Sequence, residues 1–235
     1  MGNRTVQFVE DEFYHVYNRG TDKRVLFKDK TDHQRFLKLL YISNSVENIN
    51  VRNILRKNSE PYTFERGAPL VSIGTYCLMP NHFHILLTPC VDSGVSKFMQ
   101  KLSTGYSMYF NKRYNRTGTL FEGAFKSKWA DNDIYLKYLY AYIHLNPLKL
   151  WSRAEVVSEP SSEETLDFLQ SYTYSSLPDY LQVPRLENKI IDPASFPEYF
   201  KTVADQVNEL KDWLSYKEEV EGQFRLGETW ANFGG

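Results

Sequence analysis

The stretch that decides the fold reads Tyr76-Cys77-Leu78-Met79-Pro80-Asn81-His82-Phe83-His84-Ile85-Leu86-Leu87-Thr88. Apolar residues on both sides of Pro80-Asn81 predict two strands joined by a tight hairpin turn. Residues i and i+2 of a strand point to the same face, so His82 and His84 should project side by side. Paired imidazoles on a rigid sheet can bind a metal ion, although such a pair on an apolar strand is more often structural.

The rest of residues 1–150 alternates between strand-like and helix-like patterns. The expected elements are a strand at 12–18, a helix at 32–44 with Thr31 as its N-cap, a loop or insertion at 47–69, hairpin strands at 71–78 and 82–88, a helix from Ser93 or Val95 to about Tyr114, extended structure at 118–129 and a helix at 134–145 stopped by Asn146-Pro147. This order, β-α-β-β-α-β-α, fits an α+β fold: a ferredoxin-like split βαβ antiparallel sheet with helices on one face.

The composition of the chain limits the classes of protein to which it can belong. The chain has 235 residues and is 42% hydrophobic, enough to build a core for one substantial domain or a domain with an appendage. It has no apolar run of about 18 residues, so no transmembrane helix is expected, and its first residues lack a signal-peptide core. Its two cysteines, Cys77 and Cys90, do not form a CxxC pair. We therefore expect a reduced, cytoplasmic setting without membrane partners.

Charge divides the chain into two parts. Residues 1–150 carry 21 Lys and Arg against 13 Asp and Glu, whereas residues 151–235 carry 7 against 16. A basic first part favours a polyanionic partner such as nucleic acid. We therefore predict a functional domain at 1–150 and an acidic, mainly helical C-terminal extension at 151–235, with a capping box of Ser161 and Glu164 opening one of its helices. The extension could shield the basic part, bind a partner or gate the site.

A tyrosine-rich helix supplies the chemical groups that the histidine pair lacks. Tyr138, Tyr142 and Asn146 are spaced by four residues and fall on one helical face. Tyr142 offers a phenol nucleophile, and Asn146 offers a carbonyl oxygen suited to a hard cation. Two imidazoles and one amide oxygen could hold Mg²⁺ or Mn²⁺, which would polarise a scissile phosphate. Taken singly, such tyrosines are more often core residues and such an asparagine a helix stop.

At this point the sequence resembles a known family. His82-Phe83-His84 matches the His-hydrophobic-His (HUH) signature of single-tyrosine transposases, and residues 142–147 look like the Tyr-x-x-x-Asn-Pro element of its REP-associated tyrosine transposase branch. Three further segments resemble that branch, so the likeness covers roughly residues 10–150. They are His15-Val16-Tyr17-Asn18-Arg19-Gly20, Tyr109-Phe110-Asn111-Lys112-Arg113-Tyr114 and Gly118-Thr119-Leu120-Phe121-Glu122-Gly123.

The resemblance implies a DNA transposase whose ferredoxin-like catalytic core cuts and rejoins hairpin-forming single-stranded DNA. It makes His82 and His84 metal ligands, with Asn146 as the third. Tyr142 becomes the nucleophile, forming a 5′-phosphotyrosine link and releasing a 3′-hydroxyl. Tyr138 is the backup nucleophile one turn earlier, and Tyr140 is disfavoured. A homodimer, and the use of Tyr142 within its own subunit or across subunits, both stay open.

Basic residues interleaved with aromatic ones predict contacts to single-stranded DNA, because bases stack on rings while phosphates pair with cations. A solvated face over buried aromatics is an equal alternative. The DNA-binding candidates are Arg19, Lys23, Arg24, Lys112, Arg113, Arg116, Lys126 and Lys128. In the segment at 118–125 the chain departs from the family, which usually has Gln and Arg where Glu122 and Ala124 stand. This loss of positive charge should weaken phosphate contacts there.

Two other functions are compatible with the same residues. A replication initiator or conjugative relaxase shares the histidine pair, but usually orders its tyrosine and HUH elements differently and often carries a further histidine. A non-catalytic nucleic-acid-binding module on a ferredoxin-like sheet would use the histidines as structural residues. Formation of a covalent protein–DNA adduct that depends on Tyr142 distinguishes the enzyme from the binding module.

Overall fold

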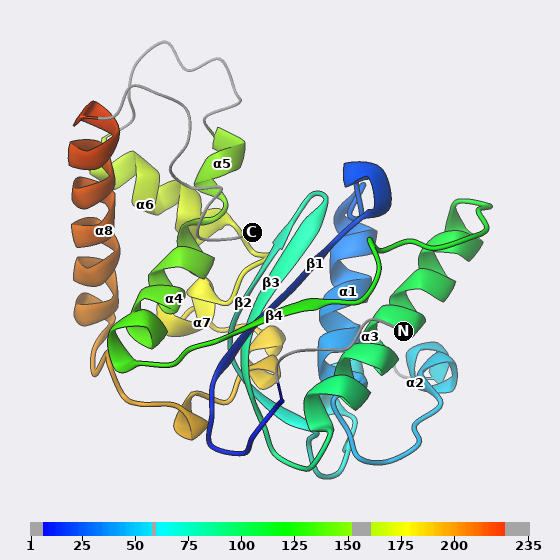
Figure 1. Cartoon of the computed structure of the whole chain (residues 1–235). Helices are drawn as coiled ribbons and strands as arrows, with labels where there is room; N and C mark the ends of the chain where they lie inside the picture. The colour runs from blue at the N-terminus through cyan, green and yellow to red at the C-terminus, as the bar shows by residue number, and fades with distance from the viewer. Residues whose placement is uncertain (1–6, 58–59, 152–160, 224–235) are drawn as a thin grey trace.

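The computed structural model describes residues 7–57, 60–151 and 161–223. Its centre is a four-stranded sheet in the order β2-β3-β1-β4, with every neighbouring pair antiparallel (Figure 1). The strands are β1 (Tyr14–Arg19), β2 (Val71–Met79), β3 (His82–Pro89) and β4 (Lys126–Trp129). The α-helices are α1 (Lys30–Ile42), α2 (Val51–Lys57), α3 (Gly94–Arg113), α4 (Asp133–Leu145), α5 (Leu148–Trp151), α6 (Ser162–Ser171), α7 (Leu177–Tyr180) and α8 (Val203–Gln223). Short 3-10 helices lie at Thr21–Lys23, Pro61–Thr63, Leu186–Ile190 and Pro193–Ser195.

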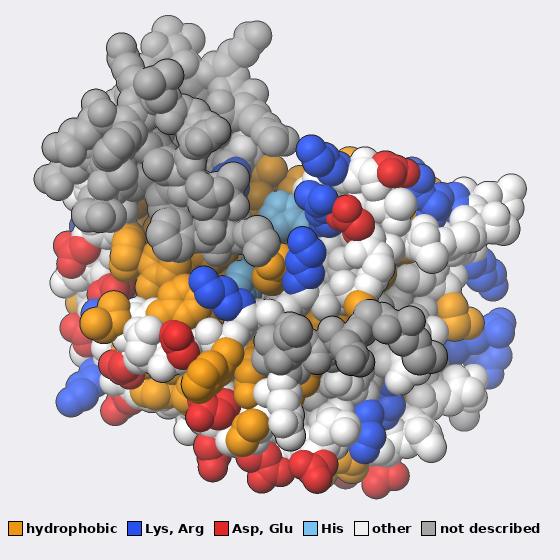
Figure 2. All heavy atoms as spheres, viewed as in Figure 1, with side chains coloured by type: hydrophobic (Ala, Val, Ile, Leu, Met, Phe, Trp, Pro, Cys, Tyr) orange, Lys and Arg blue, Asp and Glu red, His pale blue; other side chains and the backbone are white. Residues whose placement is uncertain are grey.

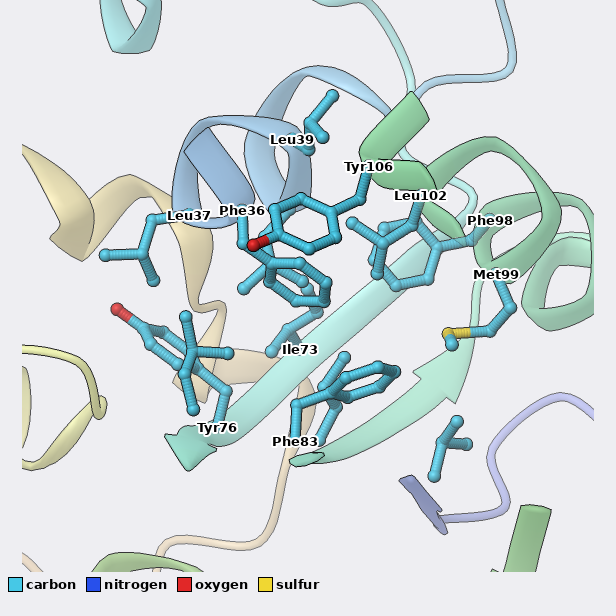
Figure 3. Packing of buried hydrophobic residues seen from close by; sticks show 14 of the residues in the cluster. Phe36, Leu37, Leu39, Ile73, Tyr76, Phe83, Phe98, Met99, Leu102 and Tyr106 are labelled. Atoms are coloured by element: carbon cyan, nitrogen blue, oxygen red, sulfur yellow. The ribbon is translucent and has the colours of Figure 1, made fainter. Parts of the chain in front are cut away.

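The two faces of the sheet are covered by different helices. Helices α1 and α3 cover one face, where Phe36 of α1 packs against Phe83 of β3 and Tyr106 of α3 (Figure 3). Helix α4 covers the other face together with residues of the C-terminal part. The predicted α+β, ferredoxin-like class is confirmed. The prediction put the helices on one face, which holds for α1 and α3, whereas α4 lies on the opposite one.

The predicted β2–β3 hairpin forms, with Met79 opposite His82 across the Pro80-Asn81 turn. The loop after β1 fixes this turn. The backbone N–H groups of Leu26 and Phe27 donate to the Pro80 carbonyl at 2.7 and 3.0 Å, and Gly20 donates to the Asn81 carbonyl at 2.9 Å. These bonds hold the start of β3, and with it His82, against the end of β1.

Helix α4 begins and ends where its sequence indicates. The Asn132 side chain caps its start by accepting a hydrogen bond from the Tyr135 N–H at 2.8 Å. The helix ends at Leu145, directly before Asn146-Pro147. On one side Leu139 and Ile143 pack with sheet residues such as Leu86. Because both ends are defined, the positions of Tyr142 and Asn146 relative to the sheet are defined as well.

The C-terminal part packs onto α4 and onto the outer edge of the sheet. The predicted capping box of Ser161 and Glu164 is present at the start of α6. Ser175 forms a β-bridge with Cys77 of the edge strand β2, and Ala141 of α4 shares a core cluster with Leu210 of α8. The part described, 161–223, is helical with no assigned strand, as predicted. Residues 152–160, which follow the predicted boundary at 150, lie outside the described residues, so that boundary stays a prediction.

Two local expectations were wrong. The N-cap of α1 is Asp29 rather than Thr31, because the Asp29 carboxylate accepts from the N–H groups of Thr31 and Asp32 at 2.9 and 3.1 Å. The expected loop at 47–69 contains the short helix α2 and a 3-10 turn.

Within the described ranges, none of the helices combines the length and apolar character needed to cross a membrane.

Candidate active site

Antiparallel pairing gathers polar side chains on the α4 face of the sheet. Residues directly opposite each other on paired strands share a face. Across β1 and β3, Arg19 lies opposite His82 and Tyr17 lies opposite His84. Across β1 and β4, Tyr17 lies opposite Lys126 and His15 opposite Lys128. One face therefore carries three imidazoles, a phenol and three basic groups: His15, His82, His84, Tyr17, Arg19, Lys126 and Lys128.

The three imidazoles are in contact. The ring centroids of His82 and His84 are 5.0 Å apart. His15 stacks on His84 with the same centroid distance and an interplanar angle of 23°, and His15 Nε2 lies 2.9 Å from His84 Nδ1. His15 and His84 are buried and His82 is half-buried. The predicted side-by-side histidine pair is thus joined by a third histidine from β1.

Burial keeps His84 neutral and leaves one of its ring nitrogens unpaired. Burial, followed by the charges of His15, His82 and Lys149, lowers the pKa of His84 well below its usual value. Burial also lowers the pKa of His15, to about 3, with a smaller effect from Lys128. His84 Nε2 has no hydrogen-bond partner within the described residues although it is buried. A buried, neutral and unpaired imidazole nitrogen is costly unless a ligand engages it.

His82 is oriented by its neighbour in the hairpin turn. Its Nδ1 lies 2.7 Å from Asn81 Oδ1. An amide oxygen can only accept, so Nδ1 carries the hydrogen and the lone pair is on Nε2. The turn that ends β2 therefore also fixes the orientation and the tautomer of His82.

Helix α4 places Tyr142 against the histidines. The Tyr142 ring centroid is 5.5 Å from that of His84 and 5.8 Å from that of His15. Burial raises the pKa of Tyr142, and a hydrogen bond with the Asn146 side chain opposes the rise. The phenol therefore stays protonated at neutral pH unless a positive charge stabilises its anion.

Asn146 and Lys149 lie next to Tyr142. Asn146 Nδ2 donates to the Tyr142 carbonyl at 2.8 Å, which accounts for the helix-stop role of this residue. Its Oδ1 accepts from Lys149 Nζ at 3.0 Å, and Nζ lies 5.4 Å from the centroid of the Tyr142 ring. The Asn146 carbonyl oxygen is therefore engaged by the Lys149 ammonium, and its role as a metal ligand stays a prediction. A carbonyl oxygen has a second lone pair for another partner.

The other tyrosines of α4 are in different surroundings. Tyr138 is 5.7 Å from Tyr142 by ring centroids, but it also packs edge-on against Trp213 of α8 at 4.8 Å. Tyr140 is buried and contacts Tyr180 and Phe196. Burial raises the pKa of both phenols. Tyr142 is therefore the α4 tyrosine that contacts the histidines.

The basic candidates fall into three groups. Lys23, Lys112, Lys126 and Lys128 are exposed; Figure 2 shows histidine atoms in a hollow of one face with Lys and Arg side chains beside them. Arg24 and Arg116 are half-buried, and Arg116 donates to Asn111 Oδ1 at 2.8 Å. Two arginines are engaged by carboxylates: Arg19 by Glu122, and Arg113 by Asp29 and Asp32.

These ion pairs change the expected roles of both arginines. The Arg113 guanidinium is balanced by two carboxylates from the α1 region and holds α3 against α1, so we do not retain it as a DNA contact. Arg19 Nη2 donates to Glu122 Oε1 at 2.9 Å, directly beside the row that holds His82. The Arg19 guanidinium lowers the pKa of Glu122, which stays ionised. The unusual Glu122 therefore neutralises a positive charge next to the histidine pair.

The structure places His84 beside His82 and Tyr142, and Asn146 bonds to the backbone of Tyr142, while the roles of these four residues stay predictions. Sequence reasoning did not identify Lys149, Tyr17 or His15 as site residues. The alternation of His15 and Tyr17 along one strand was a usable signal for the face they share. Lys149 follows Asn146 by three residues, but the intervening proline obscured the helical spacing. Within the described residues, no group of three or more His, Cys, Asp or Glu side chains is arranged to hold a metal ion.

Similarity to known proteins indicates the family of the chain. The model of the family described as "Transposase IS200 like" matches residues 10–146. The chain belongs to the IS200-like transposase family. The matched range contains the histidines, Tyr142 and Asn146, and ends before the C-terminal part. A solved structure of a REP-associated tyrosine transposase bound to a REP hairpin is similar over 80% of this chain and 90% of that one, with 11% identity and a TM-score of 0.49. No protein among the curated ones matches the chain.

Proposed function

We propose that this transposase-family chain cleaves and rejoins hairpin-forming single-stranded DNA through a phosphotyrosine on Tyr142, as a member of the REP-associated branch. The observation that carries the proposal is the contact between His84 and Tyr142 on one face of the sheet. His82 and His84 come from β3, and their ring centroids are 5.0 Å apart. Tyr142 comes from α4, and its ring centroid is 5.5 Å from that of His84. If the two histidines had only a structural role, the unpaired buried nitrogen of His84 beside the Tyr142 phenol would serve no purpose.

The same residues fit a divalent cation, Mg²⁺ or Mn²⁺. His82 and His84 would bind it through Nε2, and Asn146 would bind it through Oδ1. The fit rests on the unpaired His84 Nε2 and on the Asn81 contact that leaves the His82 lone pair on Nε2. Asn146 Oδ1 has a second lone pair besides the one that accepts from Lys149. When bound, such an ion neutralises charge on the scissile phosphate and on the phenolate.

The reaction conserves phosphodiester bonds. The Tyr142 oxygen loses its proton and attacks the phosphorus, the bond from phosphorus to the 3′-oxygen breaks, and that oxygen takes up a proton to become a 3′-hydroxyl. The 5′-phosphate is then linked to Tyr142. A 3′-hydroxyl attacks this link in the second step and releases the tyrosine, so no nucleotide cofactor is consumed. Lys149, at 5.4 Å from the Tyr142 ring, helps to stabilise the phenolate.

The DNA strand would lie along the rows of β1 and β4. Lys126 and Lys128 stand opposite Tyr17 and His15, so their ammonium groups border the site. Lys128 Nζ lies 4.5 Å from the centroid of the Tyr135 ring, which combines a cation with an aromatic surface. Lys23, Arg24, Lys112 and Arg116 would bind phosphates farther away, and Arg19 would do so once released from Glu122.

A cleavage assay on the full chain tests the proposal. Protein with Mn²⁺ and end-labelled hairpin oligonucleotides of varied foot sequence should give an SDS-resistant protein–DNA adduct. Tyr142→Phe should abolish the adduct because it removes the attacking oxygen. Tyr138→Phe is the matched control: it makes the same change one turn earlier on the same helix and should leave the adduct intact.

Two results would contradict the proposal. One is the absence of any adduct from the wild-type chain across the oligonucleotide set, with binding retained, which would favour the non-catalytic module. The other is an adduct that persists in Tyr142→Phe. Circular dichroism of both variants verifies that the comparison concerns folded protein.

A further inference from the structure

His15 is the histidine of the α4 face that the proposed reaction does not use. It is 2% exposed, so it cannot contact DNA from solution. Its Nε2 lies 2.9 Å from Nδ1 of His84, from a strand 69 residues away in the sequence. Its ring stacks on His84 and on Tyr17, both at 5.0 Å by centroids. A contact this specific needs an explanation beyond packing.

The hydrogen bond between the two imidazoles has two possible directions. If His15 Nε2–H donates to His84 Nδ1, the hydrogen of His84 is on Nε2, buried and without an acceptor in the described residues. If His84 Nδ1–H donates to His15 Nε2, the lone pair of His84 is on Nε2, available to a ligand. A buried N–H without an acceptor is costly, and a lone pair that faces a cation does not carry that cost.

We infer that His15 is a positioning residue: it accepts the Nδ1–H of His84, which fixes the ring and directs the Nε2 lone pair of His84 toward the metal. The same relation holds between Asn81 and His82, where an amide oxygen is the acceptor. Both histidines of the pair are thus held in the same tautomer by one outer partner each. This inference rests on the proposed function for the identity of the ligand, but not for the tautomer.

The geometry also separates His15 from a third metal ligand. Its Nε2 is directed at His84 Nδ1, on the edge of that ring away from the unpaired Nε2. A metal ion bound by His82, His84 and Asn146 would therefore contact Nε2 of His84 and not Nε2 of His15. The extra histidine common in relaxases thus differs in role from this one.

Two substitutions at residue 15 separate hydrogen bonding from packing. His15→Phe keeps a ring that can stack on His84 but removes the acceptor. His15→Gln gives up the ring but places an amide oxygen at the same number of bonds from Cα as Nε2. His33→Phe is the matched control, because His33 lies on α1, stacks on Phe27 and Tyr174, and contacts no residue of the site.

The measurements are imidazole ¹⁵N spectra of the metal-free full chain at pH 7 and Mn²⁺ titrations without DNA. Wild type should show His84 with its hydrogen on Nδ1. His15→Phe should lose this preference and bind Mn²⁺ about 10- to 100-fold more weakly, the usual effect of removing an outer partner of a ligand. His15→Gln should retain the tautomer and most of the affinity, and His33→Phe should match wild type.

Three results would overturn the inference: His84 with its hydrogen on Nε2 in wild type, unchanged Mn²⁺ affinity in His15→Phe, or equal losses in the Phe and Gln variants, which would mean that the ring rather than the acceptor matters. A wild-type chain that has the expected tautomer, loses it in His15→Phe and binds no Mn²⁺ upholds the role of His15. The absence of Mn²⁺ binding would instead contradict the metal dependence of the proposed function.

Discussion

Phe83 and His84 are neighbours on β3, yet they face opposite sides of the sheet. Phe83 packs with Phe36 and Phe121 in an apolar core under α1 and α3. His84 faces α4 and contacts His15, His82 and Tyr142. The same strand therefore stabilises the fold with one set of residues and forms the site with the alternate set. We therefore expect substitutions on one face to leave the function of the other largely unchanged.

The largest effect is expected from His84→Phe. This change removes a proposed metal ligand and should lower adduct formation on the order of a thousandfold, because a bound cation supplies several kcal/mol to the transition state. The free energy of unfolding should change by less than about 1 kcal/mol, since an unpaired buried nitrogen disappears while His15 loses its partner. Adduct yield and urea unfolding measure the two quantities. A stable variant with wild-type activity would show that His84 has no role in the chemistry.

On the opposite face, Phe83→Ala should have the reverse effect. Truncating a fully buried phenylalanine typically lowers the free energy of unfolding by about 3–5 kcal/mol. At a temperature where the variant is still folded, adduct formation by the remaining native protein should be close to that of wild type. Urea unfolding and an assay in the cold measure the two effects. A large loss of activity in fully folded Phe83→Ala would mean that the two faces are coupled.

The α4 face should make the protein sensitive to acid. Burial lowers the pKa values of His15 and His144 to about 3 from the usual 6.5. The unfolded chain binds protons at these residues below pH 6.5 and the folded chain does not, so stability should fall as pH drops from about 6.5 toward 3. The expected slope is on the order of 1 kcal/mol per pH unit for each histidine. Urea unfolding from pH 7 to pH 4.5 measures it.

The difference in pH slope between wild type and His15→Gln gives the contribution of His15 separately from that of the carboxylates. The glutamine variant should lose stability less steeply with acid because it lacks one histidine that protonates on unfolding. Equal slopes in the two proteins would mean that His15 is protonated in the folded state as well.

The smallest effect is expected from Glu122→Gln. The change releases Arg19, beside the row of His82, from its exposed ion pair. Single-stranded DNA should bind a few-fold more tightly at low salt, and the slope of log K against log salt should steepen by about 0.7 for the added phosphate contact. Fluorescence anisotropy at several salt concentrations measures both. Glu163→Gln, on α6, is the control, and an identical response in the two variants would rule out a special role for Glu122.

The parts of this molecule that depend on local sequence were predictable. The hairpin followed from Pro80-Asn81 between apolar runs, the shared face of His82 and His84 from the strand period, and the alignment of Tyr142 with Asn146 from the helix period. The capping box at Ser161 followed from residue types at fixed spacing. In each case the physical cause lies within a few residues of its effect.

The rest required the arrangement of distant segments. His15 reaches His84 because β1 lies between β3 and β4, an order that strand patterns do not reveal. Arg113 lies 84 residues from Asp29, so its basic character suggested DNA binding while the fold uses it in an ion pair. Trp213 packs on Tyr138 through the docking of α8, and this contact was not evident from helical spacing.

The central claim is that the α4 face positions Tyr142, and no other tyrosine of that helix, as the nucleophile. Trypsin cleaves after Lys137 and Lys149, so residues 138–149 form one peptide that contains Tyr138, Tyr140 and Tyr142. The wild-type chain reacted with Mn²⁺ and a hairpin oligonucleotide, then digested with nuclease and trypsin, should yield this peptide with a nucleotide remnant. Fragmentation in the mass spectrometer should place the remnant on Tyr142. A remnant on Tyr138, on Tyr140 or on a different peptide would contradict the claim.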